Sequence, residues 1–182
     1  MTQANADHLL FQKIAEGDPR AFRQLVDSHS RPLVTYLTRL MKNQSEAEEV
    51  AQEVFVKVWQ RAADYRPSFR ASTWLHHIAH NLAVDQMRRR RGNDAVNEEQ
   101  EANPASERPH VLLENKQRAQ SLQEALDSLP LRQKTAMLLK YEQDFSNPEI
   151  ASILNLTVDA VESLLARAKR ELKSYLTEAT ES

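Results

Sequence analysis

The sequence contains no cysteine, only two glycines and no long apolar run. The lack of cysteine excludes disulfides and zinc sites built on thiolates. Gly17 and Gly92 are too few for a turn-rich β architecture or for a phosphate loop of the GxxxxGK type. There is no stretch of about 18 apolar residues to cross a membrane, and the N-terminus lacks the basic and then apolar pattern of a signal peptide. We therefore expect an all-α, soluble, cytoplasmic protein.

The formal net charge of −2 hides an uneven distribution of charge. Residues 1–91 hold 14 Lys/Arg against 10 Asp/Glu, residues 92–114 hold 1 against 6, and residues 115–182 hold 9 against 10. The acidic excess therefore lies in the middle segment. Since the distribution of charge, rather than its sum, indicates nucleic-acid contact, the net value does not exclude a nucleic-acid-binding protein.

The middle segment also differs in composition, because it is polar and has almost no apolar residue before Val111. This composition predicts a flexible acidic linker over 92–114, about 25 Å long on average and at most about 75 Å when extended. We expect two small helical domains, 1–91 and 115–182, that this tether allows to reach separate sites on a common partner.

Within the first domain, Asp18-Pro19 predicts the start of a helix, with a kink or short break near Pro32.

The segment Ser68–Arg91 predicts an amphipathic helix that Thr73 caps and Gly92 ends. A second line of this helix carries the polar and basic side chains His77, Asn81, Arg88 and Arg91, and the aromatic residues Phe69 and Trp74 stand at its start. Arginines neutralise phosphates, an amide can bind a base edge, and aromatic rings stack on unpaired bases. The segment therefore predicts a nucleic-acid surface, with a single strand as one candidate ligand. The alternative is that Trp74 fills the core and the arginines form a solvated helix end.

Residues 45–62 predict another helix, opened by a capping box at Ser45–Glu48. One stripe is apolar and suits a core: Val50, Val54, Val58 and Ala62. A second line carries Glu48, Gln52, Phe55 and Trp59. Aromatic rings among carboxylates are typical of a partner-protein surface, with Glu49 and Glu53 as its charged rim. Either ring could instead pack against the following helix.

Residues 146–172 carry the most specific local pattern. Ser146-Asn147-Pro148-Glu149 is a capping box, Asn155-Leu156 forms a tight turn, and Thr157 caps a longer helix. A short helix, a turn and a longer helix form a helix-turn-helix, whose second helix enters the major groove. An αα-hairpin without DNA would show the same period.

Three other functions are alternatives for all or part of the chain. His76 and His80 lie one helical turn apart, as in the HExxH zinc motif, but the glutamate between them and a third ligand are missing, so catalysis is not expected. A helix-turn-helix transcriptional regulator that binds DNA on its own would explain residues 115–182 only. A helical adaptor that binds proteins alone is the third alternative.

Three segments, in this order, resemble one known family. They are SEAEEVAQEVFVKVW, FRASTWLHHIAHNLAVDQMRRRR and LDSLPLRQKTAMLLKYEQDFSNPEIASILNLTVDAVESLLARAKREL. The order resembles that of the extracytoplasmic-function (ECF) group of sigma-70-type bacterial sigma factors. The resemblance implies a sigma-2 domain over 1–91, a linker over 92–114 and a sigma-4 domain over 115–182.

The resemblance also implies partners and site residues. Core RNA polymerase, through its β′ clamp helices and β flap, promoter DNA and an anti-sigma factor would be the partners, with no cofactor and no metal. The surface for the clamp helices would comprise Glu48, Glu49, Gln52, Glu53, Phe55 and Trp59. Minus-ten recognition and melting would use Arg66, Phe69, Trp74, His77, Asn81 and the basic end from Arg88 to Arg91. Minus-35 recognition would use Thr157, Ser163, Arg167, Lys169 and Arg170.

Overall fold

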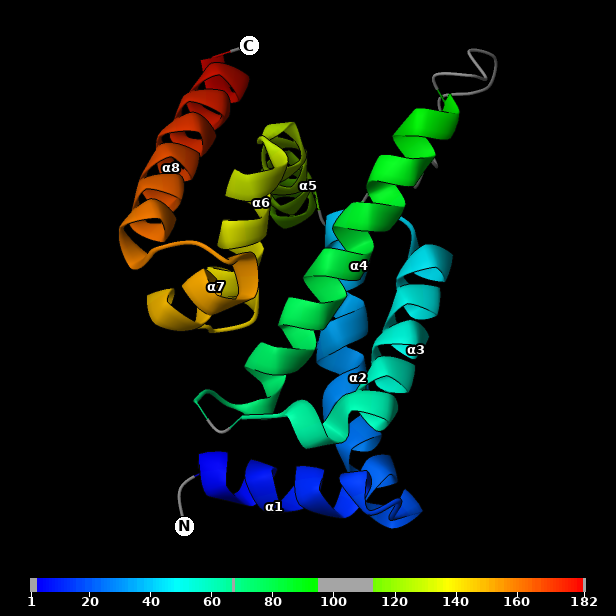
Figure 1. Cartoon of the computed structure of the whole chain (residues 1–182). Coiled ribbons are helices and arrows are strands. Elements are labelled where there is room, and N and C mark those ends of the chain that lie inside the picture. Colours follow the sequence, from blue (N-terminus) through cyan, green and yellow to red (C-terminus); the bar gives the residue numbers. More distant parts are fainter. Residues whose placement is uncertain (1–2, 67, 95–112, 182) are drawn as a thin grey trace.

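The computed structural model describes residues 3–66, 68–94 and 113–181, and these form helices joined by short turns (Figure 1). The prediction of an all-α protein is confirmed. None of the described helices is long and apolar enough to cross a membrane. The helices are α1 (Gln3–Ala15), α2 (Pro19–Met41), α3 (Gln44–Arg61), η1 (Ala62–Asp64), α4 (Ala71–Asp94), α5 (Leu113–Ser128), α6 (Leu131–Met137), η2 (Leu138–Glu142), α7 (Asn147–Leu154) and α8 (Val158–Glu181).

The first half is a bundle in which α2 packs on both α3 and α4, while α1 lies across one end (Figure 1). The apolar stripe of α3 is buried as expected, from Val50 to Ala62. Leu25, Leu33 and Leu37 of α2 are completely buried against it. Burying this apolar surface is the main force that holds the bundle together.

The start of α2 follows from its sequence. Gly17 has a φ of +86°, a conformation that glycine adopts without strain, and it separates α1 from α2. The Asp18 side chain then accepts hydrogen bonds from the backbone N–H groups of Arg20, at 2.8 Å, and Ala21, at 3.4 Å. Of the kink or short break expected near Pro32, the break is wrong, because α2 continues through Pro32 to Met41.

Three other helix boundaries also differ from the sequence-based expectation. The cap of α3 is Asn43, whose side chain accepts from the Glu46 N–H at 3.1 Å, so Ser45 lies inside the first turn. Helix α4 begins at Ala71, and the Asp7 carboxylate of α1 accepts the Ala71 N–H at 2.8 Å. Thr73 is therefore not the cap. Nor does Gly92 end α4, which runs on to Asp94.

The second half contains the predicted helix-turn-helix. The capping box of α7 is complete, since Ser146 and Glu149 each bond the other's backbone N–H. Asn155 takes the left-handed conformation, with φ 54° and ψ 50°, and ends α7. Thr157 Oγ1 accepts the Ala160 N–H at 3.2 Å at the start of α8. These local bonds satisfy backbone groups that helix ends leave unpaired.

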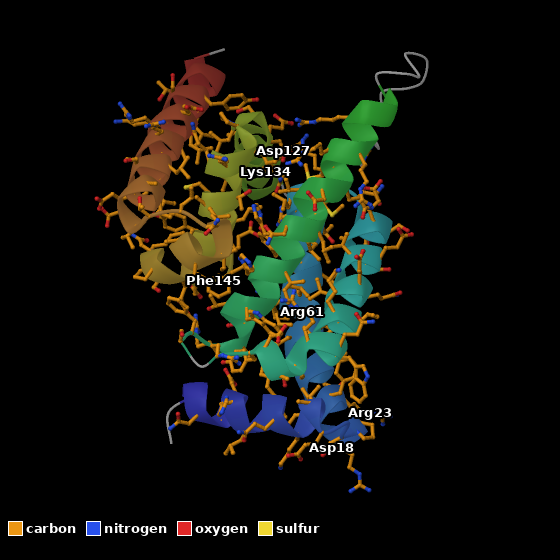
Figure 2. All side chains as sticks on the ribbon, in the orientation of Figure 1. Asp18, Arg23, Arg61, Asp127, Lys134 and Phe145 are labelled. Carbon is orange, nitrogen blue, oxygen red and sulfur yellow. The ribbon has the colours of Figure 1, made fainter. Side chains whose placement is uncertain are left out.

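The two halves pack against each other, with α7 on α4 and η2 on α2. One continuous apolar cluster includes Leu75 of α4 together with Leu139, Phe145 and Ile150 of the second half. Phe145, labelled in Figure 2, contacts the His76 ring of α4 with 4.8 Å between ring centroids. Most of the segment expected to be a flexible linker, residues 95–112, lies outside the described residues.

Candidate nucleic-acid and protein interfaces

Helix α3 exposes an acidic face with an apolar centre. Glu48, Glu49, Gln52 and Glu53 are exposed along it. Trp59 is 41% exposed and Val56 is 53% exposed. The Trp59 ring rests edge-on against Phe22 of α2, 5.1 Å between centroids, which holds the indole in place at the surface. A fixed aromatic ring within a polar rim is typical of a protein-binding surface.

Phe55 lies elsewhere than Trp59. It is only 8% exposed and belongs to the apolar cluster. This agrees with the alternative interpretation, in which the ring packs inside the bundle and does not form part of a partner surface. Val56 takes a place on the exposed face that the sequence did not suggest. Its exposure depends on which side of α3 the bundle covers, and that is a tertiary property.

The loop before α4 and the first turns of α4 surround a cavity of about 450 Å³. Four of the predicted nucleic-acid residues line it: Arg66, Phe69, Trp74 and His77. Trp74 is half-buried, with Phe11 at 5.3 Å and Tyr65 at 5.7 Å between ring centroids. One edge of the indole therefore packs in the core while its ring also contributes to the wall of the cavity. This partly fits both interpretations of Trp74.

Tyr65 holds this loop in shape and was not recognised from the sequence. Its hydroxyl donates to the Phe69 carbonyl at 2.8 Å, and its ring stacks on Phe11 at 4.1 Å. Burial, together with the charge of Asp7, raises the pKa of Tyr65 to about 12. The hydroxyl therefore keeps its proton and remains a donor to the loop.

The remaining predicted residues of α4 lie further along the helix. His77 donates from Nδ1 to the Ile153 carbonyl of α7 at 3.0 Å, and its Nε2 lies 3.4 Å from the Asn81 amide. Asn81 is exposed, as are Arg88 and Arg91 near the end of the helix. Arg88 pairs with Asp85 at 3.8 Å on the same helix, an exposed contact that leaves its guanidinium accessible. Asn81 and the exposed basic end therefore lie beyond the cavity on the same helix.

His76 and His80, the candidate metal pair, are used inside the bundle. His76 is 3% exposed and donates from Nδ1 to the Ser72 carbonyl at 2.8 Å, while His80 Nδ1 lies 3.2 Å from the Tyr36 hydroxyl. Burial lowers the pKa of each to about 4, so both rings are neutral near pH 7. Within the described part of the chain, no three His, Cys, Asp or Glu side chains gather as a metal site.

Helix α8 presents the predicted DNA-binding face of the helix-turn-helix. Ser163, Arg167, Lys169 and Arg170 are exposed along it, after the Thr157 cap. Lys169 also lies over the exposed Tyr141 ring, 5.4 Å from Nζ to the centroid. Hydroxyl and basic groups on the exposed side of a second helix suit contacts to base edges and phosphates in a major groove.

Sequence comparison identifies the class of protein that this architecture represents. Residues 25–92 match the family model of sigma-70 region 2, and residues 119–172 match that of sigma-70 region 4. The ECF RNA polymerase sigma factor SigW of Bacillus subtilis is 26% identical over 91% of this chain and 94% of its own length. SigE of Mycolicibacterium smegmatis, also an ECF sigma factor, is 33% identical over 89% of this chain and 65% of its own length.

The fold is shared with a solved structure. CnrH, in complex with the cytosolic domain of CnrY, superposes with a TM-score of 0.70, at 24% identity, over 95% of this chain and 98% of CnrH. The chain belongs to the ECF group of the sigma-70 family. Members of this family are RNA polymerase sigma factors, which act in transcription initiation.

Proposed function

We propose that the chain directs core RNA polymerase to specific promoters and helps to open their minus-ten region. The observation that supports this most directly is the arrangement of the first half. The bundle carries an exposed acidic and aromatic face on α3, an aromatic-walled cavity at the start of α4, and exposed arginines near the end of α4. A protein contact and a single-strand contact are thereby built on one rigid bundle.

The face of α3 docks on the β′ clamp helices. Trp59 and Val56 provide the apolar contact, and Gln52 with Glu49 and Glu53 provides the polar rim. Burying the exposed part of a large aromatic ring at the centre of such a contact typically contributes more than about 2 kcal/mol. Phe55 supports this face from inside the bundle and does not take part in docking.

The cavity before α4 takes a base extruded from the minus-ten element. Extrusion costs a few kcal/mol, and stacking on an aromatic ring returns roughly 1 to 3 kcal/mol per base. Phe69 and Trp74 are positioned for such stacking, and Arg66 and His77 supply polar contacts at the wall. Asn81 and the arginines to Arg91 follow the strand beyond the cavity.

The helix-turn-helix binds the minus-35 element, with Ser163 and Arg167 at base edges and Lys169 and Arg170 at phosphates. Polymerase binding places both halves on one promoter, which raises their effective concentration. The β flap is the polymerase contact of this half.

CnrH was solved with the cytosolic domain of CnrY, and a sigma factor of Bartonella quintana with the anti-sigma factor NepR. By analogy, an anti-sigma factor restrains this chain in the cytoplasm, and the chain carries out no catalysis.

Gel filtration with core RNA polymerase tests this function. The wild-type chain should co-elute with polymerase, and Gln52→Ala/Trp59→Ala should bind at least about tenfold more weakly. The matched control is Leu9→Ala/Gln12→Ala, which removes an exposed apolar side chain and an amide from α1. If wild type and control fail to bind, the sigma function is wrong. If the α3 variant binds as well as wild type, docking uses another surface.

A further inference from the structure

Glu149 of α7 is held by side chains of the other half of the molecule. The Arg70 guanidinium donates to both carboxylate oxygens, from Nε at 2.9 Å and from Nη2 at 3.2 Å. The Thr73 hydroxyl donates to the first of these oxygens at 3.1 Å. The second oxygen also accepts from the Ser146 backbone N–H and hydroxyl, each at 2.9 Å, within the capping box.

This carboxylate is fully ionised near neutral pH. Burial alone would raise the pKa of Glu149, but the hydrogen bonds from Arg70 and Ser146 outweigh burial and hold the pKa below its usual range. Arg70 and Thr73 thus form a receptor that holds an anion in this structure. A planar guanidinium fork with a hydroxyl beside it binds phosphate oxygens by the same two-point geometry.

The receptor lies at the wall of the proposed base cavity. Arg70 and Thr73 both line that cavity next to Phe69 and Trp74, and Ser152 of α7 forms part of its wall. A strand whose base enters the cavity must pass its sugar-phosphate backbone over this wall. Glu149 of α7 already occupies Arg70 and Thr73 at this wall, so these two side chains are not available to a phosphate while α7 is in place.

We propose that Arg70 and Thr73 bind a backbone phosphate of the promoter strand whose base enters the cavity, and that the Glu149 carboxylate fills this phosphate site in the isolated chain. The inference rests on the proposed function and adds two binding residues to it. The contact between α4 and α7 and the contact between α4 and DNA are then mutually exclusive. The strand enters only after α7 has left.

A second contact supports this exclusion. His77 lines the cavity and donates to the Ile153 carbonyl in the last turn of α7. A contact between His77 and DNA would therefore replace its contact with α7. The face of α3 stays exposed while α7 is in place. Polymerase can therefore dock on the closed chain, and opening follows docking.

The test uses Glu149→Gln, because glutamine at this position still completes a capping box but carries no charge. Binding of a fluorescein-labelled, mixed-sequence single strand of about 15 nucleotides to the full chain is followed by anisotropy over a range of salt concentrations. Glu149→Gln should bind about tenfold more tightly than wild type. Its plot of log affinity against log salt should steepen by about 0.7, the value for one added phosphate contact on a single strand.

Arg70→Ala separates the two roles of the receptor. A side chain that only ties the halves together would, once removed, raise DNA affinity as Glu149→Gln does. A phosphate ligand, once removed, leaves affinity at or below the wild-type value and the salt dependence shallower than in Glu149→Gln by about 0.7. Arg70→Lys keeps the charge without the fork and should recover part of the binding. Glu124→Gln removes one exposed charge from the same half, where Glu124 accepts from Gln120 of its own helix at 3.3 Å, and should change nothing.

Domain opening is measured in the same variants by energy transfer between dyes on Ala15→Cys and Lys173→Cys, which are unique thiols in this cysteine-free chain. Glu149→Gln and Arg70→Ala should both lower the transfer. If Arg70→Ala gained as much DNA affinity as Glu149→Gln, Arg70 would not be a phosphate ligand. If Glu149→Gln lowered the energy transfer without binding DNA more tightly, the phosphate site would likewise be wrong. Unchanged transfer and affinity in Glu149→Gln would overturn the masking. A wild-type chain that fails to co-elute with core polymerase would instead contradict the proposed function.

Discussion

Two aromatic residues on α3, one helical turn apart, have different environments. Phe55 is 8% exposed and Trp59 is 41% exposed, although both lie on the same line of the helix. Sequence spacing predicted this line but could not say where the bundle stops covering it. From sequence, each ring could be buried or exposed. The positions of α2 and α4 determine which ring is buried.

We therefore expect opposite results from truncating these rings. Phe55→Ala leaves a cavity in the core and should lower the free energy of unfolding by about 3 to 5 kcal/mol. Trp59→Ala should lower it by about 1 kcal/mol or less, because only the contact with Phe22 is lost, while polymerase binding falls. Urea unfolding and polymerase titration measure the two effects. A stable Phe55→Ala protein that fails to bind polymerase would contradict this assignment.

The buried histidines predict how stability depends on pH. Burial lowers the pKa of His76 and His80 to about 4, whereas an unfolded histidine titrates near 6.5. The unfolded state therefore binds more protons between these values, and the free energy of unfolding falls as pH falls through 6.5 toward 4. From pH 7 to about 5.5 the loss should be about 1 kcal/mol for each histidine.

Thermal or urea unfolding at several pH values measures this loss. The variant His76→Asn/His80→Asn does not titrate at these positions and should show a flatter pH dependence than wild type. The difference between the two curves removes the contribution of the carboxylates. Parallel curves would show that neither histidine carries the pH dependence.

At the scale of helices, the structure was predictable where the signals are local. The start and end of α7 and the start of α8 depend on hydrogen bonds between residues no more than five positions apart in the sequence. Ser146, Asn155 and Thr157 could therefore be assigned from sequence. The start of α4 depends on Asp7, which is 64 residues away, and its local candidate Thr73 faces another helix instead. A cap supplied through tertiary structure leaves no local pattern.

The cap of α3 allows a direct comparison of two candidates. Asn43→Ala removes the side-chain acceptor of the Glu46 N–H and should cost about 1 kcal/mol of unfolding free energy. Ser45→Ala, at the cap that the sequence suggested, should change stability by less than about 0.5 kcal/mol. Urea unfolding of both variants measures the difference. The reverse order would mean that the helix begins at Ser45 in solution.

At the scale of the whole molecule, sequence predicted two helical halves and an acidic segment between them, but not their packing. Glu149 appeared only as a cap because its own helix already satisfies it, and Arg70 had no visible partner. Lys42 and Asp127 add a further contact between the halves, at 3.0 Å, and the Asp127 carboxylate also binds Lys134 at 2.7 Å (Figure 2). Pairs so distant in sequence are fixed by the docked arrangement alone.

This arrangement predicts weak DNA binding by the chain alone. With α7 on the minus-ten face, promoter fragments should bind the free protein weakly, without sequence preference, and with affinity that falls steeply with salt. Adding core polymerase should produce a specific complex that survives higher salt. Gel shifts with and without polymerase measure this contrast. Tight, sequence-specific binding by the chain alone would favour a helix-turn-helix regulator instead.

The most direct test of the central claim is transcription by reconstituted polymerase. Core RNA polymerase is incubated with the chain on genomic DNA, and the 5′ ends of the transcripts are sequenced. We predict a discrete set of start sites that share one minus-ten and one minus-35 element at constant spacing and that are absent with core polymerase alone or with Gln52→Ala/Trp59→Ala. Start sites that are the same with and without the chain would contradict the account.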